Sequence, residues 1–476
     1  MTIAATIPSS DLLPADAPPV PPALIPPAPV PPARPSTWRF LRSLRTDVLG
    51  TFAREAYRRP VIAGRLFHHR FLLVNDPSGI RRVLVENAGN YVKPASSIRV
   101  LGPFTGEGLL LSEGDEWRGQ RRRVAHAFAP AHLRALQPSF AVAAENMVRA
   151  LDRGVPLDPA LFEATALDAV LRALFSDAEA GRRERLQLLV REYLTDGRGP
   201  GRIGPLDLLA RRPDSFSFLL RGRRRYSRRW FAEIEAVVAE RRGADGGGGG
   251  GGDGGGAGDL LDGLLAARDA DTGLPLPTRE VLSQVATFVA AGFETTARLL
   301  FWTAYLLALD GDEQERVRAE VDGGDPADDA DPVRRPRLRA VLQETLRLYP
   351  TAPIITRRAL ADDVVAGERV RAGDRVTISP WLVHRHERLW EDPAAFRPDR
   401  FRGKPNAYLT DDAFLPFSKG PRVCIGAGFA LTEAATVLGA LLRRYRVLSA
   451  DGPPAMPVAV VSIRPDRPYA FRLVRR

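Results

Sequence analysis

Cysteine is almost absent from this sequence, and its scarcity excludes several kinds of site. The chain of 476 residues holds one cysteine, Cys424, so it forms neither an intramolecular disulfide nor a zinc or iron-sulfur site built from several cysteines. Histidine is also scarce, and His384 and His386 stand in VHRHERLW, which is not the HExxH pattern of a zinc-binding helix. The chemical role of Cys424 must therefore be inferred from the residues around it.

The sequence also lacks a secretory leader and a long unbroken apolar run. Residues 1–36 hold twelve prolines with no charged start before an apolar stretch, so we predict a disordered or polyproline tail. The longest apolar region, Val281–Leu309, is interrupted by Gln284, Glu294 and Arg298, which favours a buried helix over a membrane span. We expect a cytoplasmic protein without a membrane anchor.

A formal net charge of +11 raises the alternative of a nucleic-acid or anionic-surface partner. The arginine runs at 121–123 and 223–225 have no zinc-finger or recognition-helix spacing around them. Solvated helix faces explain such runs. We therefore predict no nucleic-acid partner.

Periodicity predicts a mainly α protein with a minor β portion. Apolar residues at helical spacing recur across the chain, for example at 278–311 and 429–445, whereas alternating segments that favour strands occur near 61–76 and 364–380. The glycine tract at 243–258 is too costly to order as a packed element. We predict that it is a flexible loop joining two helices of one domain.

The segment around the cysteine carries the strongest chemical signal. It reads FSKGPRVCIG from Phe417 to Gly426 and precedes a predicted helix, so its sulfur is expected at a helix N-terminus, where partial positive charge stabilises a thiolate. Gly420 and Gly426 permit tight turns around a flat cofactor, while Phe417 can pack beside the ligand and Arg422 can pair with a carboxylate. A lone cysteine is otherwise an inert small hydrophobe, but these neighbours suit a loop around an anionic ring system.

This segment resembles the cysteine loop of the cytochromes P-450, FxxGxRxCxG. The resemblance spans about residues 37–476 and implies a single cytochrome P-450 fold, with haem b between the central helix and the helix after the cysteine loop. Cys424 is then the axial thiolate ligand of the haem iron. Two departures from the family pattern, the proline-rich tail and the glycine insertion, do not touch the implied site.

The central apolar helix contains AGFETT, with Glu294 and Thr295 at its middle. Thr295 can bond back to the carbonyl of Ala291, and Gly292 permits the helix to distort beside a groove. The pattern resembles the family's AGx(D/E)T(T/S) motif, which implies that Thr295 holds dioxygen or a water and that Glu294 helps relay protons. The alternative is a kinked core helix with a satisfied polar pair.

Two further charged patterns match the family in order. Glu344 and Arg347 lie three apart in QETLRL and can pair on one helical face. The resemblance adds a partner from FRPDRF, Arg400, and we expect the three to form a buried network that braces the cysteine-bearing segment. An exposed ion pair is the alternative when the motif stands by itself.

Haem propionates need cationic partners, for which arginine is the usual choice. Trp117 and Arg121 match the family's WxxxR and lie one helical turn apart. Arg358 matches a second propionate-binding arginine by its distance to Asp363, although Arg357 is adjacent to it. A solvated surface charge is the alternative for either arginine.

The resemblance implies a monooxygenase that inserts one atom of dioxygen into a hydrophobic small molecule of the fatty acid, terpenoid or polyketide class. We expect a monomer that receives electrons from a separate ferredoxin or flavodoxin and its reductase. Two alternatives remain, a haem-thiolate peroxygenase or isomerase and a non-enzymatic haem sensor. By family analogy, the roof of the substrate pocket includes parts of 85–110 and 195–230, together with Phe288, Ala291 and Phe293.

Overall fold

The fold was obtained as a computed structural model of the chain, which describes residues 24–33, 43, 46–66, 69–176, 180–194, 213, 221–246, 258–269, 271–324 and 335–476. The α-helices are α2 (Pro77–Arg81), α3 (Ala95–Thr105), α4 (Gly114–Val124), α5 (Pro130–Ala135), α6 (Gln137–Asp152), α7 (Pro159–Leu174), α8 (Ala180–Leu194), α10 (Arg221–Gly246), α11 (Leu260–Ala266), α12 (Thr278–Leu309), α13 (Gly311–Asp322), α14 (Pro336–Leu348), α15 (Pro380–Val383), α16 (Ala407–Thr410) and α17 (Ala427–Arg444). The strands are β1 (Val61–Leu66), β2 (His69–Val74), β3 (Tyr91–Val92), β4 (Ile355–Ala359), β5 (Asp363–Val365), β6 (Glu368–Val370), β7 (Arg375–Ile378), β8 (Tyr445–Leu448), β9 (Pro457–Ala459), β10 (Ile463–Pro465) and β11 (Arg472–Arg475).

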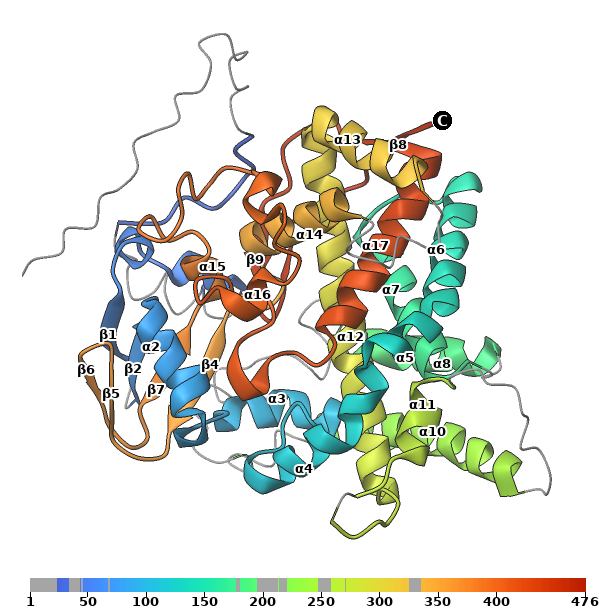
Figure 1. Cartoon of the computed structure of the whole chain (residues 1–476), viewed down its shortest axis with the longest axis horizontal. Helices are drawn as coiled ribbons and strands as arrows, with labels where there is room; N and C mark the ends of the chain where they lie inside the picture. The colour runs from blue at the N-terminus through green and yellow to red at the C-terminus, as the bar shows by residue number, and fades with distance from the viewer. Residues whose placement is uncertain are drawn as a thin grey trace, which may run out of the picture.

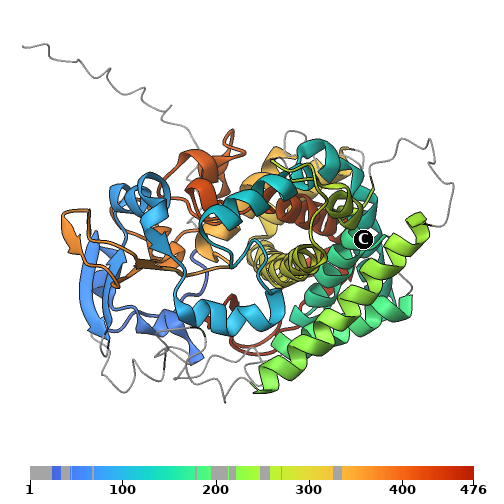
Figure 2. The same ribbon diagram turned by 90° about the horizontal axis from the view of Figure 1, so that it is seen from below.

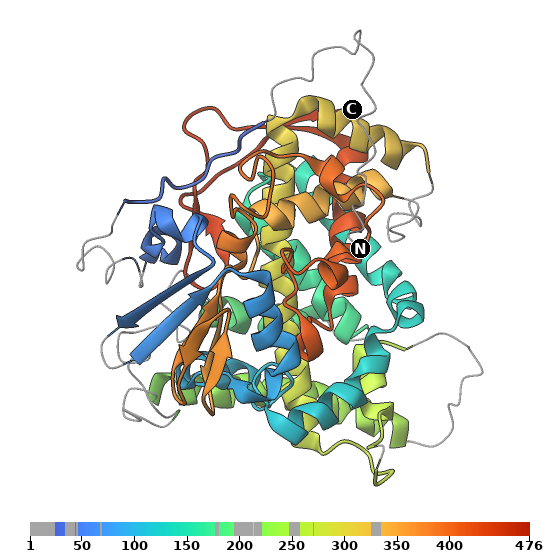
Figure 3. The same ribbon diagram turned by 60° about the vertical axis from the view of Figure 1, so that its left-hand side comes forward.

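Helices make up most of the molecule, and a small sheet lies to one side of them (Figure 1). The sheet has the strand order β1-β2-β7-β4-β3, so it joins segments from both ends of the chain (Figure 3). Its parallel pairing of β2 with β7 brings Leu72 opposite Val376. This arrangement confirms the predicted class, mainly α with a small sheet of strands far apart in sequence.

Helix α12 runs through the middle of the helical part, with α7 and α17 packed against it (Figures 1 and 2). Because neighbours surround it, most of its side chains are buried, which explains the long apolar pattern. Its Trp302 ring stacks on Tyr349, with ring centroids 4.1 Å apart. Among the residues that the structure describes, no helix combines the length and apolar character needed to cross a bilayer.

The glycine tract begins later than predicted, because α10 continues to Gly246. Residues 247–257 lie outside the described part of the chain, and α11 follows with Asp259 as its N-cap. Arg241 of α10 pairs with Asp259 at 3.0 Å, so the two helices meet near the tract. The described residues place α10 before and α11 after residues 247–257, and the flexible loop there stays a prediction.

Part of the predicted disordered tail instead packs on the molecule. Residues 24–33 have no regular secondary structure, but the carbonyl of Leu24 accepts from the amide of Phe396 and that of Pro27 accepts from the Tyr349 hydroxyl. Leu24 also contacts the main apolar core. Extended proline-rich chain keeps its carbonyls available to such donors, so residues 24–33 pack on the core. The prediction of a disordered or polyproline tail otherwise concerns residues 1–23 and 34–36, which lie outside the described range.

Candidate functional site

The buried surface of α12 is interrupted at its middle. Ala291 is exposed although it lies halfway along this enclosed helix, and Glu294 and Thr295 are partly exposed. The Thr295 hydroxyl donates to the Ala291 carbonyl at 2.8 Å, as predicted. A side chain at Gly292 would meet Val170 of α7, with its Cβ 3.0 Å from the valine Cγ2. We call this exposed part of α12, made of Ala291, Glu294 and Thr295, the α12 notch.

Two residues expected in the pocket roof, Phe288 and Phe293, are buried in the core instead. Phe288 makes an edge contact with Phe128, with ring centroids 5.0 Å apart. Of the segment 195–230, only residue 213 and residues from 221 onward lie in the described part of the chain. Of the three α12 residues predicted for the pocket roof, Phe288, Ala291 and Phe293, Ala291 is the one with an exposed side chain.

The cysteine loop has the geometry that its sequence predicts. Cys424 precedes α17, whose N-cap is Gly426, and its amide donates to the Phe417 carbonyl at 2.9 Å. Gly420 has a φ of +69°, and a Cβ there would collide with the carbonyl oxygen of Leu84. Gly420 is therefore required both by backbone conformation and by close approach, whereas Gly426 has an ordinary φ of −86°.

The thiol of Cys424 opens on an internal space. Its side chain is exposed, yet burial among surrounding protein atoms raises the pKa of the thiol, while the Gly426 amide and the Arg121 charge lower it. Both observations hold if the sulfur lines a cavity. A metal ion at this position would remove the thiol proton, because a coordinated thiol is deprotonated.

A cluster of four cations lies near the thiol with one carboxylate among them. Burial lowers the pKa of Lys93 to about 8, and the charges of Arg422 and Arg357 add to the effect. Burial likewise lowers the pKa of Arg422 to about 10, with Arg357 and Arg121 contributing. Glu113 pairs with Arg422 and, at 3.3 Å, with Lys93.

This cation cluster, Lys93, Arg121, Arg357 and Arg422, has an excess of positive charge that suits an anionic group. Arg121 is partly buried, and burial lowers its pKa. Arg422 is fixed in place, since it donates to the Ser112 carbonyl at 2.8 Å and lies 4.1 Å from the centroid of the Trp117 ring. With Glu113 counted, the cluster has three excess positive charges, and two carboxylates of a ligand would offset two of them.

The structure places Arg357, and not the predicted Arg358, with these cations. Both belong to β4, where successive side chains point to opposite faces. Arg357 has its pKa lowered by burial and feels the charge of Glu113. Asp363, which suggested Arg358, is held by Arg82 at 2.9 Å and by the Tyr91 hydroxyl at 2.7 Å. The sequence separation between Arg358 and Asp363, on which the prediction rested, therefore does not identify the arginine that joins the cation cluster.

The Glu344, Arg347 and Arg400 network is present, and Arg400 is its one partly exposed member. Arg347 binds Glu344 through two hydrogen bonds of 2.7 and 2.8 Å, and Arg400 Nε lies 3.4 Å from the same carboxylate. Both Glu344 and Arg347 are fully buried. Arg347 also donates to the carbonyls of His384, Pro393 and Ala395, so it ties α14 to the segment before the cysteine loop.

His384 extends this network to the chain just before the loop. Its Nε2 accepts from the amide of Leu415 at 2.7 Å, which leaves Nδ1 to donate to the Arg347 carbonyl at 3.2 Å. Burial, with the charges of Arg347 and Arg385, lowers its pKa to about 3, so the ring is neutral at ordinary pH. No pattern in the sequence pointed to this role of His384, since VHRHERLW was only recognised as lacking a metal motif.

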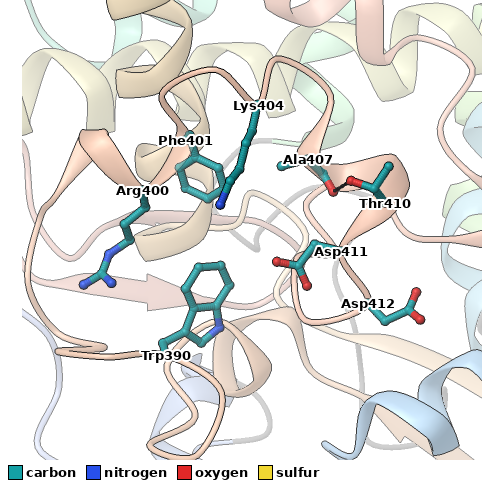
Figure 4. A pocket seen from close by; sticks show the side chains of 8 residues that line it. All are labelled: Trp390, Arg400, Phe401, Lys404, Ala407, Thr410, Asp411 and Asp412. Carbon is teal, nitrogen blue, oxygen red and sulfur yellow. Dashed lines mark hydrogen bonds between the residues drawn. The ribbon is translucent and has the colours of Figure 1, made fainter. Parts of the chain in front are cut away.

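A cavity of about 410 Å³ lies beside Arg400 (Figure 4). It is lined by Trp390, Arg400, Phe401, Lys404, Ala407, Thr410, Asp411 and Asp412. The Lys404 side chain lies beside the Phe401 ring, and the carboxylate of Asp411 lies on the opposite side of the pocket from Arg400 (Figure 4). It contains neither the thiol nor the notch of α12 and is separate from the candidate site.

The donor set at the thiol fits a haem. In the described part of the chain, no group of three His, Cys, Asp or Glu side chains is arranged to hold a metal ion, so an iron at Cys424 would need its other ligands from a macrocycle. The cation cluster supplies partners for the acidic groups that a haem carries. These features fit a haem-thiolate site.

Comparison with known proteins places the chain in a family. The family model described as Cytochrome P450 matches residues 29–471. Cyclooctatin synthase of Streptomyces melanosporofaciens is 31% identical, with 81% of this chain and 83% of that protein covered. Cyclooctat-9-en-7-ol 5-monooxygenase of the same organism is also 31% identical, with 82% of each covered.

Solved structures show the same fold. The crystal structure of the cytochrome P450DA heme domain matches with a TM-score of 0.77 at 24% identity and covers 95% of this chain and 98% of that one. The chain belongs to the cytochrome P450 family. It is a haem-dependent monooxygenase, an oxidoreductase that uses dioxygen, a substrate and redox partners.

Proposed function

We propose that this monooxygenase hydroxylates a terpenoid, the second of the three substrate classes that the sequence left open. Two similar proteins carry names from cyclooctatin chemistry, one of them a cyclooctat-9-en-7-ol 5-monooxygenase. Apolar side chains are exposed where such a substrate would bind: Ala291 in the α12 notch, Ala352, and Val461 at 48% exposure. The turn that carries Val461 is bonded to α12 and to Thr351, beside Ala352.

We propose haem b as the form of the cofactor. The single cysteine of the chain is the proposed iron ligand, and covalent attachment through a C-x-x-C-H motif needs further cysteines. The haem, when bound, supplies the oxidising chemistry, and the thiolate favours O–O cleavage. Phe417, Gly420 and Gly426 shape the loop around it.

The cation cluster and Trp117 would hold the propionates of this haem. Arg121 and Arg422 were expected in this role, and we assign Arg357 to it in place of Arg358, with Lys93 as a further partner. Their support is the excess of buried positive charge around Glu113. Trp117 packs against Arg422 and orients its guanidinium.

Glu294 and Thr295 carry the proton transfer in this proposal. Thr295 donates its own proton to the Ala291 carbonyl, so the oxygen lone pairs are left to accept a hydrogen bond from a group in the notch. Glu294, next to it, is partly exposed at 19%. This acid and alcohol pair favours a monooxygenase over a peroxygenase, whose peroxide already carries the two protons.

The domain, the oligomeric state, the location and the electron donor are also part of the proposal. We propose one haem domain from about residue 37 to the end of the chain, with residues 24–33 packed on it, working as a cytoplasmic monomer. A ferredoxin or flavodoxin with its reductase would deliver the electrons. The net charge of +11 suits an acidic partner, and reduction rates that do not fall with added salt would count against this pairing.

The observation that carries the proposal is the exposed thiol of Cys424 just before the N-terminus of α17, with Arg121 close enough to affect its pKa. Reduced protein treated with carbon monoxide should show the red-shifted absorption of a thiolate-ligated haem. An imidazole-like spectrum would overturn the haem-thiolate assignment. Titration with geranylgeraniol, dodecanoic acid and a macrolide should give the largest spin-state change with the terpenoid, and a stronger response to either of the others would refute the substrate class.

A further inference from the structure

The carboxylate of Glu294 is held by a side chain from the other end of the fold. Its Oε1 accepts a hydrogen bond from the hydroxyl of Ser462, in the turn between β9 and β10. Ser462 is 5% exposed, so water does not compete freely for this contact. Within the described residues, the other carboxylate oxygen of Glu294 has no hydrogen bond and stays available.

The position of Ser462 is fixed by its neighbours. The amide of Ile463 donates to the Thr351 carbonyl at 3.3 Å. The carbonyl of Ile463 accepts from Trp302 Nε1 at 3.1 Å. Trp302 is fully buried on α12, the helix that carries Glu294. The turn therefore cannot shift relative to α12 without breaking these bonds, and the hydroxyl is presented to Glu294 at a set place.

The nearby arginine does not replace this contact. Arg298 Nη2 lies 4.0 Å from Glu294 Oε1, beyond hydrogen-bonding distance. The same Nη2 makes a 2.8 Å ion pair with Glu163 of α7. Among the described residues, Ser462 is thus the hydrogen-bond donor that fixes the Glu294 side chain, and Arg298 contributes charge from a distance.

We propose that Ser462 is a positioning residue for proton transfer, which anchors Glu294 Oε1 so that the other oxygen points into the α12 notch. The inference rests on the proposed role of Glu294. A carboxylate without this anchor samples several rotamers, and fewer of them reach the reacting group. Ser462 does not touch the substrate or the cofactor in this proposal.

The expected consequence is loss of coupling. In the coupled reaction, substrate, dioxygen, two electrons and two protons yield hydroxylated product and one water. When proton delivery is late, the same dioxygen, electrons and protons leave as hydrogen peroxide. Ser462→Ala should raise the peroxide formed per NADPH by a factor of about three to ten, below the 10²–10⁴ of a proton-transfer group itself, since Glu294 remains.

The test uses haem-bound full-length protein, NADPH, a ferredoxin and its reductase, with and without geranylgeraniol. Ser462→Thr keeps the hydroxyl and should restore peroxide yield to near the wild-type level. Ser176→Ala is the matched control, because the Ser176 hydroxyl donates to Asp259 at 2.8 Å, at the far end of α7 from Glu163. It should leave the yield unchanged.

A crystal structure of haem-bound Ser462→Ala gives a readout that does not depend on turnover. Glu294 should leave its single position there and return to it in Ser462→Thr. An unmoved Glu294, or unchanged peroxide yield in Ser462→Ala, overturns the inference. Failure of the proposed function is seen separately, in the wild-type protein, as absence of the thiolate carbon monoxide spectrum.

Discussion

The stability of the protein should depend on pH through one buried acid, Glu433 of α17. Both of its carboxyl oxygens are buried without a hydrogen-bond partner in the described structure. Burial raises the pKa of this group well above its usual value of 4.5, and the Thr296 hydroxyl nearby offsets only part of the effect. The folded state therefore keeps the proton at pH values where the unfolded chain releases it.

The sign of the effect follows from proton linkage. Between pH 4.5 and the raised pKa, the unfolded state binds fewer protons, so the free energy of unfolding falls as pH rises. The slope is about 1.4 kcal/mol per pH unit for one group. Glu433→Gln removes this slope, so its stability relative to wild type should rise with pH, by up to about 1.4 kcal/mol for each pH unit between 4.5 and the raised pKa.

Urea unfolding of the haem-bound proteins, followed by far-ultraviolet circular dichroism at each pH, measures this difference. Glu235→Gln on the exposed face of α10 is the control and should show no change in slope. A stability difference between Glu433→Gln and wild type that stays flat with pH would show that Glu433 is ionised in the fold. The reasoning from burial would then be refuted.

Three further outcomes are expected. Thr295→Ala should keep the carbon monoxide spectrum but increase peroxide per NADPH several-fold; unchanged coupling would remove Thr295 from its role. Gly420→Ala should lower haem content and cost about 1–2 kcal/mol from the strained backbone alone, with more from the collision with Leu84, so a normal melting temperature and haem content would contradict the loop geometry. Arg357→Gln should speed haem loss to apomyoglobin more than Arg358→Gln, and the reverse order would return the propionate role to Arg358.

Local patterns in the sequence were sufficient for much of the fold. Helical spacing located α12 within a few residues, and the alternating segments located β1, β2 and β7. The hydrogen bond from Thr295 to Ala291 was also predictable, because it joins residues one helical turn apart. Each of these features depends on contacts close in sequence.

Other features depend on pairings that no local pattern encodes. Adjacent arginines in a strand look equivalent in sequence, and which face of β4 meets the cation cluster is decided by how the sheet packs. The tail segment 24–33 is ordered through contacts with residues more than 300 positions away. Nothing in the sequence distinguishes Ser462 from other serines in turns, because its contact with Glu294 forms only in the folded protein.

The contacts that hold the cysteine loop in place come from distant parts of the chain, so the short motif around Cys424 depends on the whole fold. The loop itself is held by Gly420 against the backbone of Leu84, and the chain before it is held by Leu415, His384 and Arg347 in turn. Each link satisfies a buried polar group, so breaking one leaves an uncompensated donor or charge. The segment that carries Cys424 is therefore held at Leu415 and at Gly420, both of which precede the cysteine in the chain. Through Arg347 the position of this segment depends on α14, while the Gly426 amide and the Arg121 charge oppose the rise that burial causes in the pKa of the Cys424 thiol.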